Sequence, residues 1–226
     1  MPLIIAIDGP AAAGKSSVAR ALAKKLGLLY LDSGSLYRAM AWKVLQKGID
    51  VSVESDVETV CEASKIMLSH GEADTAEVWV DSENATPFLR DAEVTRVASI
   101  LSAYSGVRKK ILLLQRGIAQ QGVVAEGRDM GTVVFPDADI KFYLDAALSI
   151  RGQRRYEEFQ SKGVTCNLAT IISEIEERDR RDQHRKVAPL SVATDAVMID
   201  STSLSMEEVI AIMEKEIKCR CASGLD

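Results

Sequence analysis

The most constraining feature of the sequence is the segment Gly9-Pro10-Ala11-Ala12-Ala13-Gly14-Lys15-Ser16-Ser17, which directly follows an apolar run at residues 3–8. The form G-x-x-x-x-G-K-S after a strand is typical of a phosphate-binding loop. Small residues let the backbone N–H groups turn toward an anion, and a helix beginning near Lys15 adds the positive end of its dipole. Lys15 is expected to reach the β- and γ-phosphates of ATP, and the Ser16 hydroxyl to bind a Mg²⁺ ion that bridges them. The alternative is a strand-to-helix turn of small residues with one surface lysine.

Length and composition bound the class of protein. With 226 residues, of which 47% are hydrophobic and 27% charged, the sequence predicts a globular protein with one domain and inserts. The net charge of −5 argues against binding to nucleic acid or to an anionic membrane, so small-molecule partners are expected. Nothing resembles a coiled coil, so a monomer is the default expectation.

The expected location is the cytoplasm. No apolar run is long enough to span a membrane, and the strand expected from Leu3 leaves no room for a signal peptide. The four cysteines follow neither a zinc-site spacing nor a dense disulfide pattern, so free thiols are expected. No role is assigned to the pair Cys219 and Cys221.

Short apolar segments alternate with segments of helical spacing along most of the chain. The expected strands are residues 3–8, 28–31, 123–125, 140–145 and 196–200. This alternation predicts an α/β protein with a parallel sheet covered by helices on both faces, whose ligand lies beyond the carboxyl ends of the strands. Residues 65–90 break the pattern and predict three short antiparallel strands, with turns at Gly71 and at residues 82–84.

Basic side chains gather in the segment 178–186, which carries five basic and two acidic residues. Four residues of the segment are spaced to share one face of a helix, namely Arg178, Arg181, Asp182 and Arg185. One explanation is a solvated helix surface paired with two preceding glutamates. The other is an arginine-lined site for phosphoryl transfer, because one guanidinium group can donate two parallel hydrogen bonds to the oxygens of a phosphate. The phosphate loop, three arginines within residues 151–155 and an Arg-Asp pair at 128–129 favour this second explanation.

Four segments together resemble the bacterial cytidylate kinases: IDGPAAAGKSS, LDSGSLYR, EGRDMGTVVFPDADIKFYLDA and ERDRRDQHRKVAPL. Members of this family pass the γ-phosphate of ATP to CMP or dCMP. The resemblance implies the three-layer α/β fold of P-loop nucleoside monophosphate kinases, with a five-stranded parallel sheet flanked by helices, a small antiparallel insert and an arginine-bearing lid. It implies a core formed by residues 1–64, 91–146 and 189–226, an insert at 65–90 and a lid at 147–188.

The resemblance also implies roles for individual residues. Those expected to bind the acceptor nucleotide are Ser33, Tyr37, Arg38, Ser99, Arg108, Arg128, Asp129, Arg178, Asp182 and Arg185. Within this set, Arg38 and Arg128 would contact the phosphate, Ser99, Arg108 and Asp129 would face the cytosine ring, and Arg178 and Asp182 would lie at the ribose. Those expected to act in the transfer are Lys15, Arg128, Asp129, Arg154 and Arg181.

Elementary chemistry is consistent with these roles. Cytosine offers one donor and two acceptors, so a carboxylate beside an arginine complements it, whereas a base with an acceptor at position 4 would lose the carboxylate's bond. The alternatives are that Asp129 pairs with Arg128 or caps the next helix, and that Asp182 forms an ion pair with Arg178. The expected reaction is direct in-line transfer with no covalent intermediate and no general base. Two other functions stay open: a kinase for another nucleoside monophosphate or small metabolite, and an ATP-dependent switch.

Overall fold

The computed structural model describes residues 2–70 and 76–223, and their contacts form two compact units. Unit 1 comprises Met1–Leu31 and Ala119–Asp226, and unit 2 comprises Asp32–Ile118. The division into core, insert and lid expected from the sequence is not tested by this grouping and stays a prediction. Residues 71–75 of the expected insert, including the turn at Gly71, lie outside the described residues, as do 224–226 of the expected core.

Unit 1 is built on a parallel sheet. Its elements are β1 (Ile4–Asp8), α1 (Lys15–Leu26), β2 (Leu29–Asp32, whose last residue opens unit 2), the 3-10 turn η3 (Ala119–Gln121), β6 (Val123–Gly127), the π-helical turn η4 (Met130–Val134), β7 (Ile140–Asp145), α6 (Leu148–Ser161), α7 (Leu168–His184), β8 (Val197–Asp200) and α8 (Met206–Ser223). The strand order β2-β6-β1-β7-β8 places β1 in the middle, with β6 and β7 parallel to it on either side. The five-stranded parallel sheet expected from the sequence is therefore confirmed.

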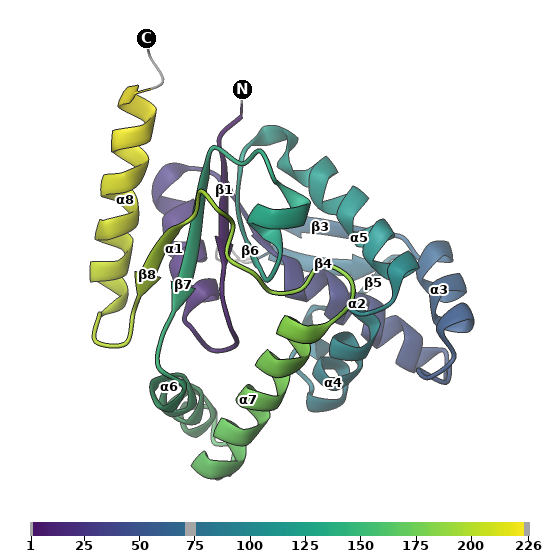
Figure 1. The fold of residues 1–226 in the computed structure, drawn as a ribbon. Coiled ribbons are helices and arrows are strands. Elements are labelled where there is room, and N and C mark those ends of the chain that lie inside the picture. The colour runs from purple at the N-terminus through teal and green to yellow at the C-terminus, as the bar shows by residue number, and fades with distance from the viewer. Residues whose placement is uncertain (1, 71–75, 224–226) are drawn as a thin grey trace. The chain divides into compact units, whose positions relative to one another are not determined.

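The sheet buries its apolar side chains against two helices. Ile5 and Ile7 alternate with Ala6 and Asp8 along β1, so the two isoleucines share one face of the sheet. Helices α1 and α8 pack there (Figure 1), and the buried cluster is Ile5, Ile7, Val18, Ala19, Leu22, Ala23, Val124, Ile140, Phe142, Leu144, Ile199, Val209, Met213 and Ile217. Each large member contributes about 1.5–3 kcal/mol by leaving water. This core fixes the position of β1, and therefore of the loop that follows it.

Two helices pack together beyond the carboxyl ends of the strands. Helices α6 and α7 lie side by side in Figure 1, where β7 leads into α6. Ile171 and Ile175 of α7 form a second buried cluster with Ala11, which belongs to the loop after β1. The helix pair is thus in direct apolar contact with that loop.

Unit 2 combines helices with a small antiparallel sheet. Its elements are α2 (Ser33–Gln46), α3 (Glu54–Ala63), β3 (Ile66–His70), β4 (Ala76–Val80), β5 (Glu83–Asn84), the 3-10 turn η2 (Thr86–Phe88), α4 (Ala92–Leu101) and α5 (Ser105–Ile118). The antiparallel order β3-β4-β5 confirms the three expected strands.

The turn expected at residues 82–84 is displaced, because Glu83 and Asn84 form β5. Asp81 and Ser82 make the turn with φ of 50° and 71°, and positive φ at both positions is what a type I′ turn of a two-residue hairpin requires. Among the helices described in both units, none has the length and apolar character needed to cross a membrane.

Candidate active site

The phosphate loop occupies the turn between β1 and α1, where the sequence places it. Gly9 has φ of 146°, and a Cβ atom there would lie 2.0 Å from the Leu144 carbonyl oxygen of β7, so only glycine fits. Ala12 and Gly14 also have positive φ, at 59° and 93°. The chain then enters α1 at Lys15. Within the loop Pro10, Ala11 and Ala13 are buried, whereas Ser16 and Ser17 are exposed on the first turn of α1.

Lys15 is a buried residue, so the alternative of a surface lysine is wrong. Its side chain is 5% exposed, and Nζ donates a hydrogen bond to the Pro10 carbonyl oxygen at 2.6 Å. Burial, followed by the positive charge of Arg128, lowers the pKa of Lys15 from 10.5 to about 7. An anion placed at Nζ would stabilise the charged form. The lysine is therefore suited to bind phosphate.

Ser16 lies beside a carboxylate that the sequence analysis did not assign to the site. Its Oγ donates to Glu126 Oε1 at 2.6 Å, and the Tyr30 hydroxyl lies 3.3 Å from the same oxygen. Glu126 is buried at the end of β6, where it pairs in register with Ile7 of β1. A hydroxyl and a carboxylate are the hard oxygen donors that Mg²⁺ prefers. The available signal was the position of Glu126 at the carboxyl end of a buried strand.

Asp8 connects the end of β1 to the segment after β6. Its two carboxylate oxygens accept hydrogen bonds from Met130 N at 2.8 Å and Gly131 N at 2.7 Å. Burial raises the pKa of the Asp8 carboxyl from 3.8 to about 6 against the effect of these bonds. Asp8 therefore fixes the turn that directly follows Arg128 and Asp129.

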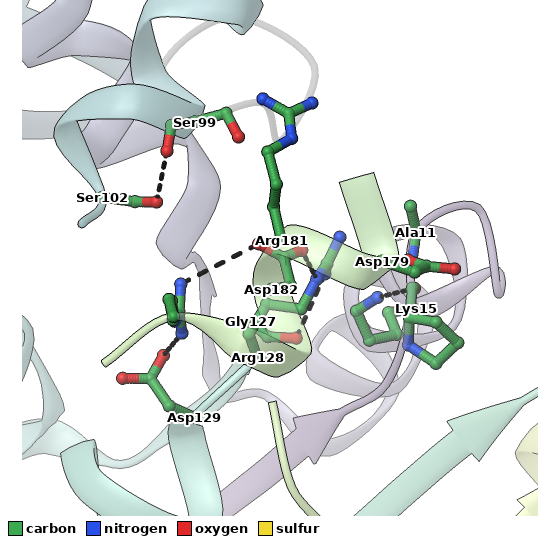
Figure 2. Close-up of polar contacts among 12 residues, drawn as sticks. Ala11, Lys15, Ser99, Ser102, Gly127, Arg128, Asp129, Asp179, Arg181 and Asp182 are labelled. Atoms are coloured by element: carbon green, nitrogen blue, oxygen red, sulfur yellow. Dashed lines mark hydrogen bonds and ion pairs between the residues drawn. The ribbon is translucent and has the colours of Figure 1, made fainter. Parts of the chain in front are cut away.

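Arginines and carboxylates form a buried cluster in unit 1 (Figure 2). Arg128 Nε donates to Asp182 Oδ2 at 2.7 Å. Arg185 lies 3.5 Å from Asp129 Oδ1 and 4.0 Å from Asp182 Oδ1. Burial alone would raise the pKa of Asp182, but the positive charges of Arg128, Arg178 and Arg185 lower it. Asp129 makes no cap bond with its side chain to the η4 turn. We call Arg128, Asp129, Asp182 and Arg185 the arginine cluster.

Helix α7 does not present all four of its predicted residues on one face. Arg178 and Asp182 are one turn apart on the inner side, whereas α7 ends at His184 and Arg185 follows in an extended conformation. Arg181 is 48% exposed, lies 3.7 Å from Glu177, and extends away from Asp182 in Figure 2. Successive residues of a helix are rotated by about 100° around its axis, so Arg181 points away from the side of α7 on which Asp182 is buried. Arg181 therefore forms the kind of surface ion pair that the alternative expects, and its role in the transfer stays a prediction.

Arg154 lies beside the loop. Its guanidinium donates to Ser201 Oγ at 3.0 Å and to the Ser201 carbonyl oxygen at 2.6 Å. A Cβ atom added to Gly14 would lie 4.0 Å from Arg154 Nη1. The expected lid, residues 147–188, contributes two arginines to the predicted transfer, Arg154 and Arg181. Of these, Arg154 lies near the start of α1.

In unit 2, Asp32 organises the start of α2. Its Oδ1 caps the helix by accepting from Ser35 N at 3.0 Å, and Oδ2 pairs with Arg38 Nη2 at 2.5 Å. A Cβ atom on Gly34 would lie 2.8 Å from Arg38 Nη1, so the glycine leaves space for the guanidinium. Ser33 is buried and accepts a hydrogen bond from Gln115 Nε2 at 2.8 Å. Gln115 is a further polar residue that the sequence analysis did not identify.

Unit 2 also brings together the remaining predicted acceptor residues. The Arg108 guanidinium lies 5.7 Å from the centroid of the Tyr37 ring. Arg108 also donates to the Ser102 carbonyl oxygen at 2.9 Å, and Ser102 Oγ donates to the Ser99 carbonyl oxygen at 2.9 Å. Tyr37, Arg108 and Ser99 therefore lie on neighbouring parts of α2, α5 and α4.

Comparison with known proteins identifies the family. The family model described as Cytidylate kinase matches residues 5–219. The chain belongs to the cytidylate kinase family. It is 41% identical to a protein named cytidylate kinase from Citrifermentans bemidjiense, over 98% of this chain and 95% of that protein. It is 42% identical to a protein of the same name from Enterococcus faecalis, over 95% of each. A solved structure of an uncharacterised Eubacterium ventriosum protein matches 96% of this chain and 98% of its own, with a TM-score of 0.51 and 13% identity, which shows the fold alone.

This member of the cytidylate kinase family has a buried ion pair at its loop, Arg151–Asp179, that the sequence analysis did not assign to the site. Asp179 of α7 and Arg151 of α6 are both buried and both bond to the backbone of Ala11. The Arg-Asp pair at 178–179 and the arginines within 151–155 were visible in the sequence. The bonds of Asp179 and Arg151 to the loop were not visible, because they join residues far apart in the sequence.

Proposed function

We propose that this protein transfers the γ-phosphate of ATP to CMP or dCMP, giving ADP and CDP or dCDP. Membership of the cytidylate kinase family supports this activity, as do relatives of that name at 41% and 42% identity over nearly the whole chain. The carrying observation is that unit 1 holds the arginine cluster in addition to the loop with the buried Lys15. A switch needs one phosphate-binding site, whereas a phosphotransferase needs one for the donor and one for the acceptor.

The donor side of the proposal concerns the loop and two arginines. Lys15 and the N–H groups of the loop after Ala11 would bind the β- and γ-phosphates of ATP, and Arg154 and Arg181 would reach the phosphates from the predicted lid. Ser16 Oγ and Glu126 are the oxygen donors that would hold Mg²⁺. When bound, the ion would neutralise negative charge on the phosphates.

The acceptor side assigns the remaining residues. Arg38 and Arg128 would bind the phosphate of CMP, and Asp129 would accept the cytosine amino group. The residues proposed to complete acceptor binding are Ser33, Tyr37, Ser99, Arg108, Arg178, Asp182 and Arg185. The Asp129 carboxylate accepts hydrogen bonds only, so a base with an acceptor at position 4 would be disfavoured.

The chemistry proposed is a single in-line displacement. The acceptor phosphate is already ionised near neutral pH, so its oxygen attacks the γ-phosphorus without a general base. Arginines and Lys15 stabilise the charge on the transferring group, and their fixed positions supply orientation. A lid at 147–188 would exclude water, which would otherwise accept the phosphoryl group. We also propose that the protein works as a monomer in the cytoplasm, without nucleic-acid or membrane partners.

An acceptor panel tests the proposed function. ADP release from ATP is measured with CMP, dCMP, UMP, AMP, or no acceptor. The proposal expects rapid release with CMP or dCMP and little without acceptor. Equal or faster release with UMP or AMP would favour a kinase for another monophosphate. Slow release that no acceptor accelerates would favour a switch.

A further inference from the structure

Both backbone polar groups of Ala11 are bonded to side chains of the helix pair. Asp179 Oδ1 accepts from Ala11 N at 2.8 Å, and Arg151 Nη1 donates to the Ala11 carbonyl oxygen at 2.9 Å. Arg151 also donates through Nε to the Ala146 carbonyl oxygen at 2.9 Å, and it pairs with Asp179. The Ala11 methyl group packs against Ile171 and Ile175 of α7. Helices α6 and α7 therefore fix this one peptide from several directions.

The backbone on either side of Ala11 is in conformations that need such support. Gly9 has φ of 146°, and Ala12 has φ of 59° although it carries a side chain. A non-glycine residue with positive φ is unfavourable and persists where its surroundings determine it. The bonds to Asp179 and Arg151 lie between these two positions. They also direct the Ala11 N–H to a carboxylate, so this N–H is not a donor to phosphate.

The charges of the two side chains explain why they occur as a pair. A lone buried carboxylate near the loop would repel phosphate, and a lone buried carboxylate or guanidinium carries a large desolvation cost. Together they add no net charge, and the planar guanidinium reaches two carbonyl oxygens as well as the carboxylate.

We infer that Asp179 and Arg151 are positioning residues that hold the first half of the phosphate loop in its ATP-binding conformation. This inference rests on the proposed use of ATP as phosphate donor. Asp179 lies three residues from Asp182 of the arginine cluster, on the same helix. Helix α7 therefore contacts both the donor loop, through Asp179, and the arginine cluster, through Asp182. The role inferred for Asp179 and Arg151 concerns the donor loop alone.

Substitution of Asp179 tests the inference through the two Michaelis constants. Asp179→Asn removes the charge that pairs with Arg151, and it is expected to raise the KM for ATP about tenfold or more. The KM for CMP is expected to stay within about twofold, because the arginine cluster keeps its contacts. Asp179→Glu keeps the carboxylate and is expected to retain more ATP affinity than Asp179→Asn. The matched control is Glu176→Gln, an exposed acid of the same helix, which should leave both constants unchanged.

A purely structural role would give a different result. Loss of folded protein lowers kcat and leaves both KM values unchanged, and that outcome for Asp179→Asn would overturn the inference. For any variant of reduced stability, the affinity for a nonhydrolysable ATP analogue is measured below its unfolding temperature, and an unchanged affinity would likewise overturn it. A wild-type protein that binds the analogue but phosphorylates no nucleotide would refute the proposed function, while the analogue affinities would still decide the role of Asp179.

Arg151 supplies an independent arm of the test. Arg151→Lys keeps the charge but loses the planar fork, so ATP affinity is expected to fall. Arg155→Lys is the matched control, because Arg155 is partly exposed on α6 and pairs with Glu158. Because Asp179 and Arg151 act on the same peptide, the double variant is expected to lose less than the sum of the two single losses. Fully additive losses would contradict a common action on Ala11.

Discussion

The binding of ATP should be linked to protonation of Lys15. In the free protein, burial and then the neighbouring charge of Arg128 lower the pKa of Lys15 to about 7. Phosphate at Nζ favours the charged form and raises this pKa, so binding takes up a proton wherever the free lysine is neutral. With a pKa near 7, the lysine is about nine-tenths neutral at pH 8 and about one-tenth neutral at pH 6. The linkage therefore predicts that ATP binds about tenfold more weakly at pH 8 than at pH 6.

Titration calorimetry with a nonhydrolysable ATP analogue measures this effect. Experiments in buffers of different ionisation enthalpy give the number of protons taken up, which is expected to be near one at pH 8 and near zero at pH 6. Lys15→Met should lose the proton uptake at pH 8 that is due to the lysine, and any pH dependence left in this variant reports the titration of the nucleotide itself. Lys24→Met, at an exposed position of α1, should behave like wild type. Equal proton uptake by wild type and Lys15→Met at pH 8 would refute the reasoning.

Three further substitutions test separate parts of the account. Gly9→Ala places a Cβ atom 2.0 Å from the Leu144 carbonyl oxygen, so denaturant unfolding should show a loss of about 3 kcal/mol or more, whereas Gly117→Ala, with open space around its Cβ, should show none. Glu126→Gln should raise the Mg²⁺ concentration for half-maximal ADP release about tenfold, and an unchanged Mg²⁺ titration would remove this residue from the proposed ion site. Asp129→Ala should lower the ratio of kcat/KM for CMP over UMP about tenfold or more, and an unchanged ratio would show that it does not select the base.

The parts of the molecule that could be predicted from sequence are those encoded locally. The phosphate loop lies within nine consecutive residues. Its glycines permit the backbone turn and its lysine supplies the positive charge, and neither role depends on distant parts of the chain. The alternation of short apolar runs with helical segments was sufficient for the parallel sheet, and the change of pattern at residues 65–90 for the small antiparallel sheet. The displaced turn had a weaker local mark, because Asp81 suits the first position of such a turn but Ser82 stands where glycine is usual.

The contacts that complete the loop were not predictable because they join distant parts of the chain. Glu126 is 110 residues from Ser16 and becomes its neighbour only because β6 pairs with β1. Asp179 is 168 residues from Ala11 and reaches it through the packing of α7. The exposure of Arg181 depends on how that helix rotates in its packing, which spacing alone does not determine. The assignment of individual residues to ATP or CMP stays a prediction.

The central claim is that phosphate passes directly from ATP to a cytidine monophosphate. The most direct test is to incubate the protein with Mg²⁺, CMP and ATP labelled in the γ-phosphate, and to separate the products. The account predicts that the label appears in CDP, in amounts equal to the ADP formed, and that Lys15→Ala abolishes this transfer. Label found only in inorganic phosphate, or the absence of labelled CDP after all ATP has been consumed, would contradict the account.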